Sequence, residues 1–479
     1  MVYNRVGVTL KDLLEKHKSY EPSLNTELIT KAYNFAEAAH VGQKRLSGEG
    51  MLEHVSEVAG ILTEVQADST TIAAALLHDV LEKTNLEQEA LAEEFGGEIT
   101  SLVEGLRAVK EAGSHVTAEE ERDWENLRHM MLASIKDPRV LLIRLAEKIH
   151  NLRTISALPP ERQKTSAQKV FDIWSPLAAI LGLYRFKAEL EDRAFSILEP
   201  EKYKEIEEKV RAQAGEMERV VETVKEKLTE ALQKEGIVGE MKGRTKHLYG
   251  VYRKLPRYQE KAGGMFYDLL GFRVVVATVE ECYRVLDIIR RLWREVPGLF
   301  DDYIAHPKPN GYQSLQDVFE IDSHLVEIQI RTKTMEEFAE YGLAAHQHYA
   351  TLEGEKKREG SLPASEAKVA LIKSLAFWEK GQELNLFPNE VFVFTPKGDV
   401  KVLPKGATPI DFAFAVHTDL GKNCSGAKVN EKMISLNYQL QNGEVVEIIT
   451  GRGRKPSSDW LAFVKTELAR SQIQKSLKS

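Results

Sequence analysis

The spacing of apolar residues changes along the chain, and this change most limits the possible fold. Up to about residue 235, apolar residues recur every three or four positions, as in ITKAYNFAEAAH, STTIAAALLHDVLEK and PRVLLIRLAEKIHNLRTI, which predicts helices. From about 239 to 350, MFYDLLGFRVVVAT and HLVEIQIRT predict strands separated by the helical run EECYRVLDIIRRLW. Residues 388–451 predict short strands and turns, with a hairpin at Asn442-Gly443 between LNYQL and VVEII. We therefore expect domains of three different kinds.

Length and composition support globular domains. The 479 residues are 43% apolar and 29% charged, which fits about three folded domains and argues against a disordered chain. No apolar stretch reaches the roughly 18 residues of a membrane span. The two cysteines, Cys282 and Cys424, are too few for a disulfide scaffold, and the first residues lack the apolar core of a secretory signal. We expect a cytoplasmic protein, and its net charge of −8 argues against a general nucleic-acid coat.

Residues 199–236 form a highly charged stretch at helical spacing that ends in a glycine. Paired charges of this kind are typical of a solvated helix surface. We therefore expect a solvated helical connector over 199–238.

Four side chains of the helical domain are candidates for a metal site: His54, the adjacent His78 and Asp79, and Glu147. On one continuous helix, Glu82 would share a face with His78 and Asp79. Imidazole and carboxylate together suit a divalent ion such as Mn²⁺ that activates water. The alternative is that these histidines are packed or capping residues.

A second set of polar residues follows one face of the helix that contains Glu147. Asn151 and Thr154 lie four and seven residues after Glu147, which places the three side chains on the same side.

The second domain begins with a basic run over residues 242–254 without a single acid. Its cations are Lys242, Arg244, Lys246, Arg253 and Lys254. Such a run suits a polyphosphate, although a solvated surface is the alternative.

The strands of the second domain contain two carboxylates. In VEIQIRT, apolar residues alternate with Glu327, Gln329 and Arg331, and Asp268 lies in the other strand run. On adjacent strands, Asp268 and Glu327 would hold Mg²⁺ between them, unless both are edge carboxylates that face water. The turn in HPKPNGYQSL is expected to expose Tyr312, whose ring could stack on a base or pack as an anchor.

The segments AHVGQKRLSGEGMLEH, ALLHDVLEKT and LAEKIHNLRT resemble the HD-type hydrolase domain of the RelA/SpoT homologues. The resemblance implies an all-α domain over 1–198 that removes the 3′-pyrophosphate from (p)ppGpp with Mn²⁺. It implies metal ligands at His54, His78, Asp79 and Glu147, a catalytic role for Glu82, and substrate contacts at Arg45, Ser47, Asn151 and Thr154.

Several positions depart from the hydrolase pattern of that family. Lys83 replaces a second acidic residue and puts a positive charge beside the expected metal and water. Glu147 replaces an aspartate, Val55 a proline, and Ala179 and Ile180 two polar residues. We therefore expect a weakened or lost hydrolase, with an intact one as the alternative.

The runs GRTKHLYGVYRK, YDLLGFRV, DDYIAHPKPNGYQSL and VEIQIRTKTMEEFAEYGLAAH resemble the synthetase domain of the same family, in the same order. The resemblance implies an α/β, nucleotidyltransferase-like domain over 239–380 that transfers pyrophosphate from ATP to the 3′-hydroxyl of GDP or GTP. The segment LFDD at 299–302 resembles the acidic form of a motif that accompanies synthesis in the family.

The resemblance also implies the roles of single residues in this domain. Asp268 would hold Mg²⁺, and Glu327 would be a metal ligand or the base that accepts the hydroxyl proton. Tyr312 would stack on guanine. The remaining contacts would be Arg244, Lys246 and Lys254 with ATP phosphates, and Lys308, Asn310 and Gln313 near the acceptor nucleotide.

The run FVFTPKGDVKVLPKGATPIDFAFAVHTDLG resembles the TGS module of long family members, a small β-rich, β-grasp-like domain expected over 388–451. The resemblance implies contact with the ribosome and uncharged tRNA, with His417 at the tRNA. Residues 452–479 resemble the start of a further helical region, so we expect a shortened chain.

The leading hypothesis is a (p)ppGpp synthetase of the stringent response with a weakened or inactive hydrolase domain. One alternative is a bifunctional enzyme or a net Mn²⁺-dependent hydrolase. Another is a catalytically inactive regulator that binds the ribosome and tRNA. No membrane partner is expected, and the sequence leaves open whether the protein is a homo-oligomer.

Overall fold

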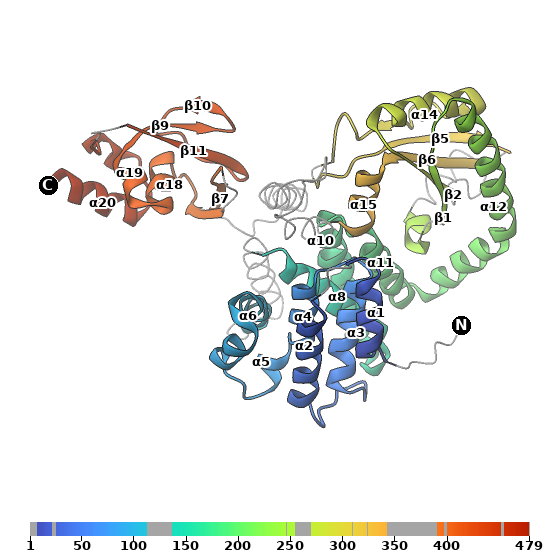
Figure 1. Cartoon of the computed structure of the whole chain (residues 1–479), viewed down its shortest axis with the longest axis horizontal. Helices are drawn as coiled ribbons and strands as arrows, with labels where there is room; N and C mark the ends of the chain where they lie inside the picture. The colour runs from blue at the N-terminus through green and yellow to red at the C-terminus, as the bar shows by residue number, and fades with distance from the viewer. Residues whose placement is uncertain are drawn as a thin grey trace. The chain divides into compact units, whose positions relative to one another are not determined.

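The computed structural model describes residues 7–21, 25–112, 137–245, 247–253, 270–308, 310–322, 324–342, 390–396, 400–451 and 455–478. The chain divides into two compact units, Met1–Glu104 with Leu142–Ser361, and Gly105–Leu141 with Leu362–Ser479. In the described part of the chain, no helix is both long and apolar enough to cross a membrane. The expected fold class is confirmed: a helical part, an α/β part and a small β-rich module follow one another (Figure 1).

The described chain up to Leu198 is helical, as the three- and four-residue spacing of its apolar residues predicts. Its helices are α1 (Leu10–Lys18), α2 (Thr26–Ala39), α3 (Met51–Thr63), α4 (Ser69–Leu76), α5 (Val80–Lys83), α6 (Gln88–Ala112), α8 (Arg139–Arg153), η2 (Ile155–Ala157), α9 (Pro160–Lys169), η3 (Val170–Trp174), α10 (Ser175–Ile180) and α11 (Tyr184–Leu198).

Small side chains form the contact between α2 and α4. Ala32 and Ala36 of α2 and Ala74 of α4 are completely buried, and the two helices pack side by side (Figure 1). Because alanine loses no side-chain entropy on burial, it suits such a helix contact, and larger residues such as Ile29 and Ile72 fill the remaining space. The turn that follows α4 is buried as well.

The run STTIAAALLHDVLEK forms two helices instead of the one that we expected. α4 ends at Leu76, α5 begins at Val80, and a turn joins them. The amide of Leu77 is shared between the carbonyls of Ala73 and Ala74, and the amide of Val80 donates to the carbonyl of Leu77 three residues earlier, so the regular helical ladder ends at this turn. His78 and Glu82 therefore do not share a helical face, and that prediction was wrong.

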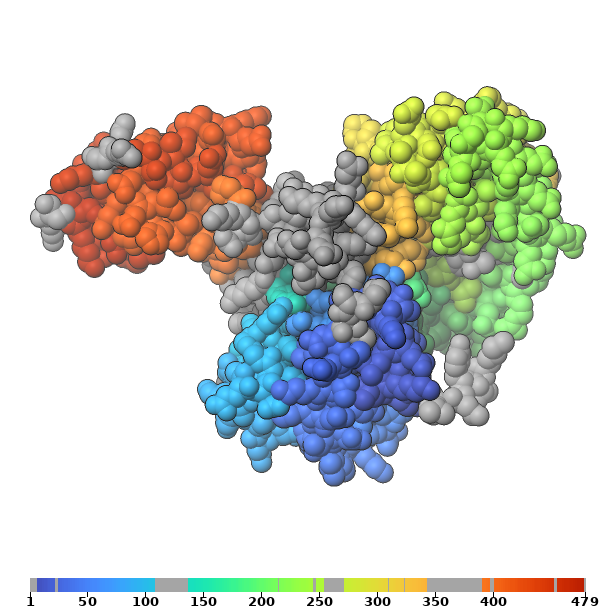
Figure 2. All heavy atoms as spheres, in the orientation of Figure 1, coloured from blue at the N-terminus to red at the C-terminus, as the bar shows by residue number. Residues whose placement is uncertain are grey.

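The stretch that we expected to be a solvated connector is the helix α12 (Pro200–Lys234), and one of its faces belongs to a hydrophobic core. In Figure 2, green atoms of α12 lie directly against yellow-green atoms of the helix α14 (Val279–Leu292). Its buried apolar residues are Ile206, Met217, Val220, Val224, Leu228 and Leu232. Their spacing forms one apolar stripe among many charges, so only the opposite face is solvated and the expected role was wrong.

A glycine ends α12 and turns the chain toward the sheet. Gly236 has a φ of +70°, which is the left-handed conformation that glycine adopts without strain. The amide of Ile237 then donates to the carbonyl of Leu232 at 3.0 Å, and Ile237 is itself buried in the core. This cap fixes the point at which the helix gives way to a strand.

The α/β part is a six-stranded sheet in the order β1-β2-β6-β5-β3, with β4 beside β5. β2 and β6 are parallel, and the other paired strands are antiparallel. The apolar residues of α12 and α14 form one core with those of the sheet. Besides α14, the elements are β1 (Glu240–Thr245), β2 (Leu270–Val276), β3 (Arg294–Glu295), β4 (Asp301–Asp302), β5 (Leu315–Ile321), β6 (His324–Thr332) and α15 (Lys333–Tyr341).

Two adjacent carboxylates of α11 hold the segment that follows β1. Glu191 is buried and accepts a hydrogen bond from His247 Nε2 at 2.9 Å, with Lys187 beside it. Burial opposes the charge of Glu191, but the hydrogen bond from His247 and the Lys187 ammonium hold its pKa lowered to about 2. Asp192 accepts a hydrogen bond from the amide of Tyr249 at 2.8 Å. These two carboxylates thus connect the helical part to the start of the α/β part.

The β-rich module is a five-stranded sheet in the order β10-β9-β11-β7-β8, with a helix packed on it. β11 is parallel to β7, and the other pairs are antiparallel. The elements are β7 (Glu390–Phe394), β8 (Val400–Pro404), α18 (Pro409–Val416), α19 (Thr418–Lys422), β9 (Cys424–Val429), β10 (Lys432–Ile434), β11 (Glu444–Thr450), η4 (Ser458–Ala462) and α20 (Glu467–Lys478).

The hairpin predicted at Asn442-Gly443 is wrong, although a turn does occur there. Asn442 Oδ1 accepts the amide hydrogen of Phe392 at 2.8 Å, and Gly443 has a φ of +82°. The turn therefore leads β11 into parallel pairing with β7 instead of back along LNYQL. The antiparallel hairpin lies between β9 and β10, where Asn430 and Glu431 both have positive φ.

Leu228 provides a test of the packing of α12. Because Leu228 is completely buried, Leu228→Ala is expected to lower the free energy of unfolding by about 3 kcal/mol through lost burial and a residual cavity. The exposed Glu226 is the matched control, and Glu226→Ala is expected to change this free energy by less than about 0.5 kcal/mol. Denaturant titrations followed by circular dichroism measure both. Equal values for the two variants would mean that α12 is a solvated connector.

Candidate functional site

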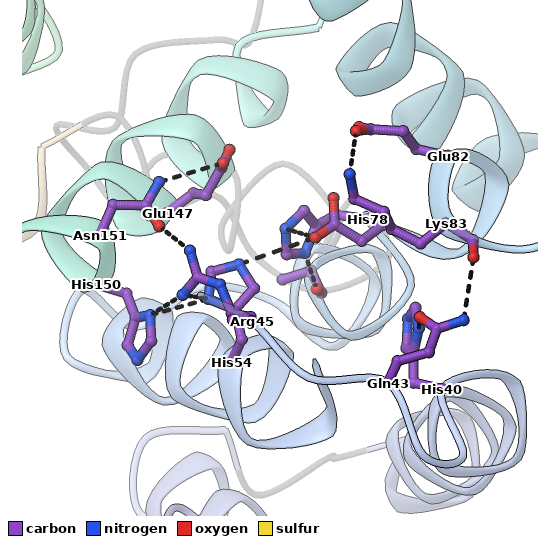
Figure 3. Close-up of polar contacts among 12 residues, drawn as sticks. His40, Gln43, Arg45, His54, His78, Glu82, Lys83, Glu147, His150 and Asn151 are labelled. Carbon is purple, nitrogen blue, oxygen red and sulfur yellow. Dashed lines mark hydrogen bonds and ion pairs between the residues drawn. The ribbon is translucent and has the colours of Figure 1, made fainter. Parts of the chain in front are cut away.

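Separate elements bring the predicted metal ligands of the helical part toward one another (Figure 3). α3 contains His54, the turn between α4 and α5 contains His78 and Asp79, and α8 contains Glu147. All four residues are almost completely buried. Burial of such polar and charged groups costs free energy unless each has a hydrogen-bond partner, an ion-pair partner or a metal ion.

His54, His78 and Asp79 form a compact cluster, called the metal group below. His54 Nε2 lies 4.0 Å from Asp79 Oδ2, and His78 Nε2 lies 3.5 Å from the same oxygen. His78 Nδ1 lies 2.7 Å from the carbonyl oxygen of Ala75, which can accept only a proton held on Nδ1. The Nε2 lone pair of His78 then faces Asp79, and among the described residues this buried atom has no hydrogen-bond partner.

The metal group fits a divalent transition-metal ion. Its candidate ligand atoms all lie within 4.8 Å of one another. Two imidazoles and a carboxylate are a ligand set suited to Mn²⁺ and similar ions. Burial, together with the nearby His78 and Arg45, lowers the pKa of His54 to about 2, so its ring is neutral and has a lone pair for a metal.

The two other carboxylates predicted for this site are paired with cations. Glu147 lies 2.5 Å from a guanidinium nitrogen of Arg144, and Glu82 lies 2.8 Å from the Lys83 ammonium. Among the described residues, neither carboxylate belongs to the metal group. The structure thus gathers three of the four predicted ligands and places Glu147 and Glu82 in ion pairs.

Two of the four predicted substrate residues of the helical part lie together. Arg45 donates a hydrogen bond to Asn151 Oδ1 at 2.6 Å. Thr154 is buried, and its hydroxyl donates to the carbonyl of His150 at 3.2 Å. Ser47 is exposed on the loop before α3.

The described part of the second predicted site centres on β6. Glu327 lies there opposite Gly271 of the parallel strand β2. Four other predicted residues are not described in full. Lys246, Lys254 and Asp268, and the side chain of Arg244 on β1, lie outside the described part of the chain.

Tyr312 is buried, with an exposed fraction of 5%, so the expected exposed ring is wrong. Its ring meets that of Tyr184 of α11 edge to face, with centroids 5.5 Å apart. The Lys308 ammonium lies 4.9 Å from the centroid of Tyr312 and 4.3 Å from that of Tyr303. A cation is attracted to the negative faces of aromatic rings, although burial lowers the pKa of Lys308. In this conformation the Lys308 ammonium lies between the rings of Tyr303 and Tyr312.

The neighbouring loop residues bind the protein itself. Asn310 Nδ2 donates to the carbonyl of Ala179 at 2.8 Å and to the hydroxyl of Tyr184 at 3.1 Å. Gln313 Nε2 donates to the carbonyl of Ile304 at 3.3 Å. The loop that was predicted near an acceptor nucleotide therefore contacts α10 and α11 through Asn310.

Arg331 has a structural role that its place in the sequence does not reveal. Its side chain is completely buried, and it donates a hydrogen bond to the Tyr312 hydroxyl at 3.0 Å. A second nitrogen lies 3.1 Å from a carboxylate oxygen of Glu336 on α15. The alternation along β6 did place a guanidinium on the polar face, but α15 and the Tyr312 loop cover that face only in the folded chain.

His417 of the β-rich module is exposed, with 66% of its side chain accessible. It precedes α19, and its ring accepts the amide hydrogen of Asp419 at 3.2 Å. Its position leaves the ring open to a partner.

Three segments of the chain match known families. Residues 32–184 match the HD domain, residues 243–353 match the region found in RelA/SpoT proteins, and residues 391–450 match the TGS domain. Each match falls on one of the three architectures described above.

Relatives named as pyrophosphokinases and relatives named as pyrophosphohydrolases are both similar to this chain over almost its whole length. A GTP pyrophosphokinase of Myxococcus xanthus is 40% identical over 97% of this chain and 62% of its own length. A probable guanosine-3′,5′-bis(diphosphate) 3′-pyrophosphohydrolase of Synechocystis is 42% identical over 93% of this chain and 60% of its own length. A guanosine-3′,5′-bis(diphosphate) 3′-pyrophosphohydrolase of Aquifex aeolicus is 42% identical over 98% of this chain and 67% of its own length.

The chain thus spans 60% to 67% of the length of these relatives. The match is continuous through the HD, RelA/SpoT and TGS regions. This chain belongs to the family of long RelA/SpoT homologues.

Proposed function

We propose that this chain is a (p)ppGpp synthetase of the stringent response, with a weakened or inactive (p)ppGpp 3′-pyrophosphohydrolase in its helical part. The main support is the ion pair of Glu82 with Lys83 at 2.8 Å. The Lys83 ammonium contacts the carboxylate assigned to proton transfer in the hydrolase and competes with water for its oxygen, so we expect that reaction to be slowed. The pairing of Glu147 with Arg144 acts in the same direction, since it occupies the fourth proposed ligand.

The synthetase reaction transfers the β,γ-pyrophosphate of ATP to the 3′-hydroxyl of GDP or GTP. The 3′-oxygen forms a bond to the β-phosphorus, the bond from this phosphorus to the oxygen of the α-phosphate breaks, and AMP leaves. Glu327 takes up the hydroxyl proton as this bond forms. Asp268 would hold Mg²⁺, which offsets charge on the phosphates, and Glu327 would be either this proton acceptor or a second ligand of the ion. Arg244, Lys246 and Lys254 bind the ATP phosphates.

The acceptor nucleotide binds at the loop of Lys308, Asn310, Tyr312 and Gln313. Guanine stacks on Tyr312 once the Lys308 ammonium leaves the ring, and the ammonium then pairs with phosphate. Asn310 donates hydrogen bonds to Ala179 and Tyr184, and these hydrogen bonds break when the acceptor nucleotide binds.

A second candidate function is that of a bifunctional enzyme or a net Mn²⁺-dependent (p)ppGpp hydrolase. It is favoured by the geometry of the metal group, in which the buried His78 Nε2 faces Asp79. In this case His54, His78, Asp79 and Glu147 would hold Mn²⁺, which would supply an activated water. The substrate contacts would be Arg45, Ser47, Asn151 and Thr154.

The β-rich module supports partners other than nucleotides. We propose that it contacts the ribosome and uncharged tRNA in the cytoplasm, with the exposed His417 at the tRNA. A catalytically inactive regulator that acts only through this module is the remaining alternative. The combination of Asp268, Glu327 and the basic run over 242–254 argues against it, because a purely binding protein needs no such set of metal-ligating and phosphate-binding side chains.

Glu327→Gln tests the synthetase. The variant removes the proton acceptor, and we expect AMP formation from ATP, GDP and Mg²⁺ to fall by at least about 100-fold. The melting temperature should stay unchanged, because glutamine keeps the size of the side chain. The control Glu320→Gln, an exposed carboxylate of β5 in the same sheet, should retain full activity. Retained synthesis in Glu327→Gln would remove Glu327 from its assigned role.

Lys83→Asp tests the weakened hydrolase. The variant replaces the ammonium paired with Glu82 by a second carboxylate, and we expect pyrophosphate release from ppGpp with Mn²⁺ to rise about tenfold or more. Lys164→Asp on the exposed face of α9 makes the same change of charge and should leave the rate unaltered. A rate in Lys83→Asp equal to that of the unaltered chain would show that the loss has another cause. Rapid hydrolysis by the unaltered chain would favour the bifunctional enzyme.

A further inference from the structure

A second cluster of side chains lies on the other edge of the His54 ring (Figure 3). His54 Nε2 faces Asp79 of the metal group, whereas His54 Nδ1 lies 2.8 Å from Nδ1 of His150 on α8. The two rings have centroids 4.8 Å apart and are tilted by 55°. His150 is itself 2% exposed, and Arg45 and Glu49 complete the cluster.

A guanidinium occupies the position that a second metal ion would need. Glu49, His54 and His150 have the composition of a metal site. However, one nitrogen of Arg45 lies 2.6 Å from Glu49 Oε1, 2.9 Å from His54 Nδ1 and 3.2 Å from His150 Nδ1. A divalent ion at the same place would meet this positive charge at contact distance, which is strongly unfavourable. The cluster therefore does not act as a second metal site.

The protonation of the His54 ring decides whether it can bind metal. A neutral imidazole has one proton, so Nε2 has a lone pair for an ion only when the proton is on Nδ1. For His78 the backbone carbonyl of Ala75 holds that proton in place. For His54 the atoms near Nδ1 are His150 Nδ1, which can accept the proton, and the Arg45 guanidinium, which can only donate one. His150 and Arg45 therefore favour opposite tautomers of His54.

We infer that His150 is the positioning residue of the metal group: its Nδ1 accepts the proton of His54 Nδ1 and so turns the lone pair of His54 Nε2 toward the ion. Loss of a residue that orients a histidine ligand in this way typically lowers metal affinity by about 10- to 100-fold. In this state Arg45 keeps its hydrogen bonds to Glu49 and Asn151. The inference rests on the metal site proposed above, but it does not depend on whether the chain hydrolyses (p)ppGpp.

Binding of Mn²⁺ to the full chain tests the inference without any measurement of activity. Titration followed by the electron paramagnetic resonance of free Mn²⁺ gives the affinity and the stoichiometry. His150→Leu removes the acceptor, and we expect affinity to fall by about 10- to 100-fold. His150→Asn places an amide oxygen near the position of Nδ1, and we expect a loss of less than about threefold. The control His17→Leu changes an equally buried histidine of α1 and should leave affinity unaltered.

Each other result of the titration contradicts the inference. Unchanged affinity in His150→Leu would mean that His54 needs no such acceptor. An equal loss in both His150 variants, or a stoichiometry lower by one ion, would mean that His150 packs the site or is itself a ligand. The absence of Mn²⁺ binding by the unaltered chain would overturn the metal site as well as the inference. Binding without hydrolysis would leave the inference intact and reject only the hydrolase.

A second measurement does not depend on the stability of the variants. Nitrogen-15 spectra of the histidine rings of the unaltered chain without added metal report which ring nitrogen has the proton. The expected result is a proton on Nδ1 of His54. A proton on Nε2 of His54 would overturn the inference.

Discussion

The apolar stripe of α12 is the contact on which the arrangement of the α/β part depends. This helix covers the same core as α14, and its buried valines and leucines meet the inner residues of the sheet. Without it, β1 and β2 would expose one face to water, because a sheet needs a second layer to bury its apolar side. The charges of α12 conceal this role in the sequence, since they occupy the solvated face of the same helix.

The helical part shows a different constraint, which is the burial of groups that prefer water. His54, His78, Asp79 and Glu147 lie inside a helical domain, where each needs a partner. Some partners are visible: a backbone carbonyl for His78, His150 for His54, and Arg144 for Glu147. A metal ion would satisfy the atoms of His54, His78 and Asp79 that face one another, and so the same burial that costs stability also prepares a binding site.

The loop that contains Asn310 and Tyr312 connects the helical part to the α/β part through contacts between residues far apart in sequence. Asn310 donates hydrogen bonds to Ala179 and Tyr184, and the ring of Tyr312 packs edge to face against that of Tyr184. The buried Arg331 donates a hydrogen bond to the Tyr312 hydroxyl. Together with the hydrogen bonds that Glu191 and Asp192 accept from His247 and Tyr249, these contacts join the helical part to the α/β part. The proposed binding of guanine at Tyr312 would have to compete with them.

The sequence by itself determined the three architectures, because apolar periodicity and turn residues are local properties of the chain. It also identified His54, His78 and Asp79, since their residue types point to a metal whatever their distance. Tertiary structure alone decided the rest. The break between α4 and α5 separated Glu82 from His78, and parallel pairing with β7 replaced the hairpin expected at Asn442-Gly443. The burial of Tyr312 and the pairing of His54 with His150 arise between distant segments, and no local pattern encodes which segments a fold will bring together.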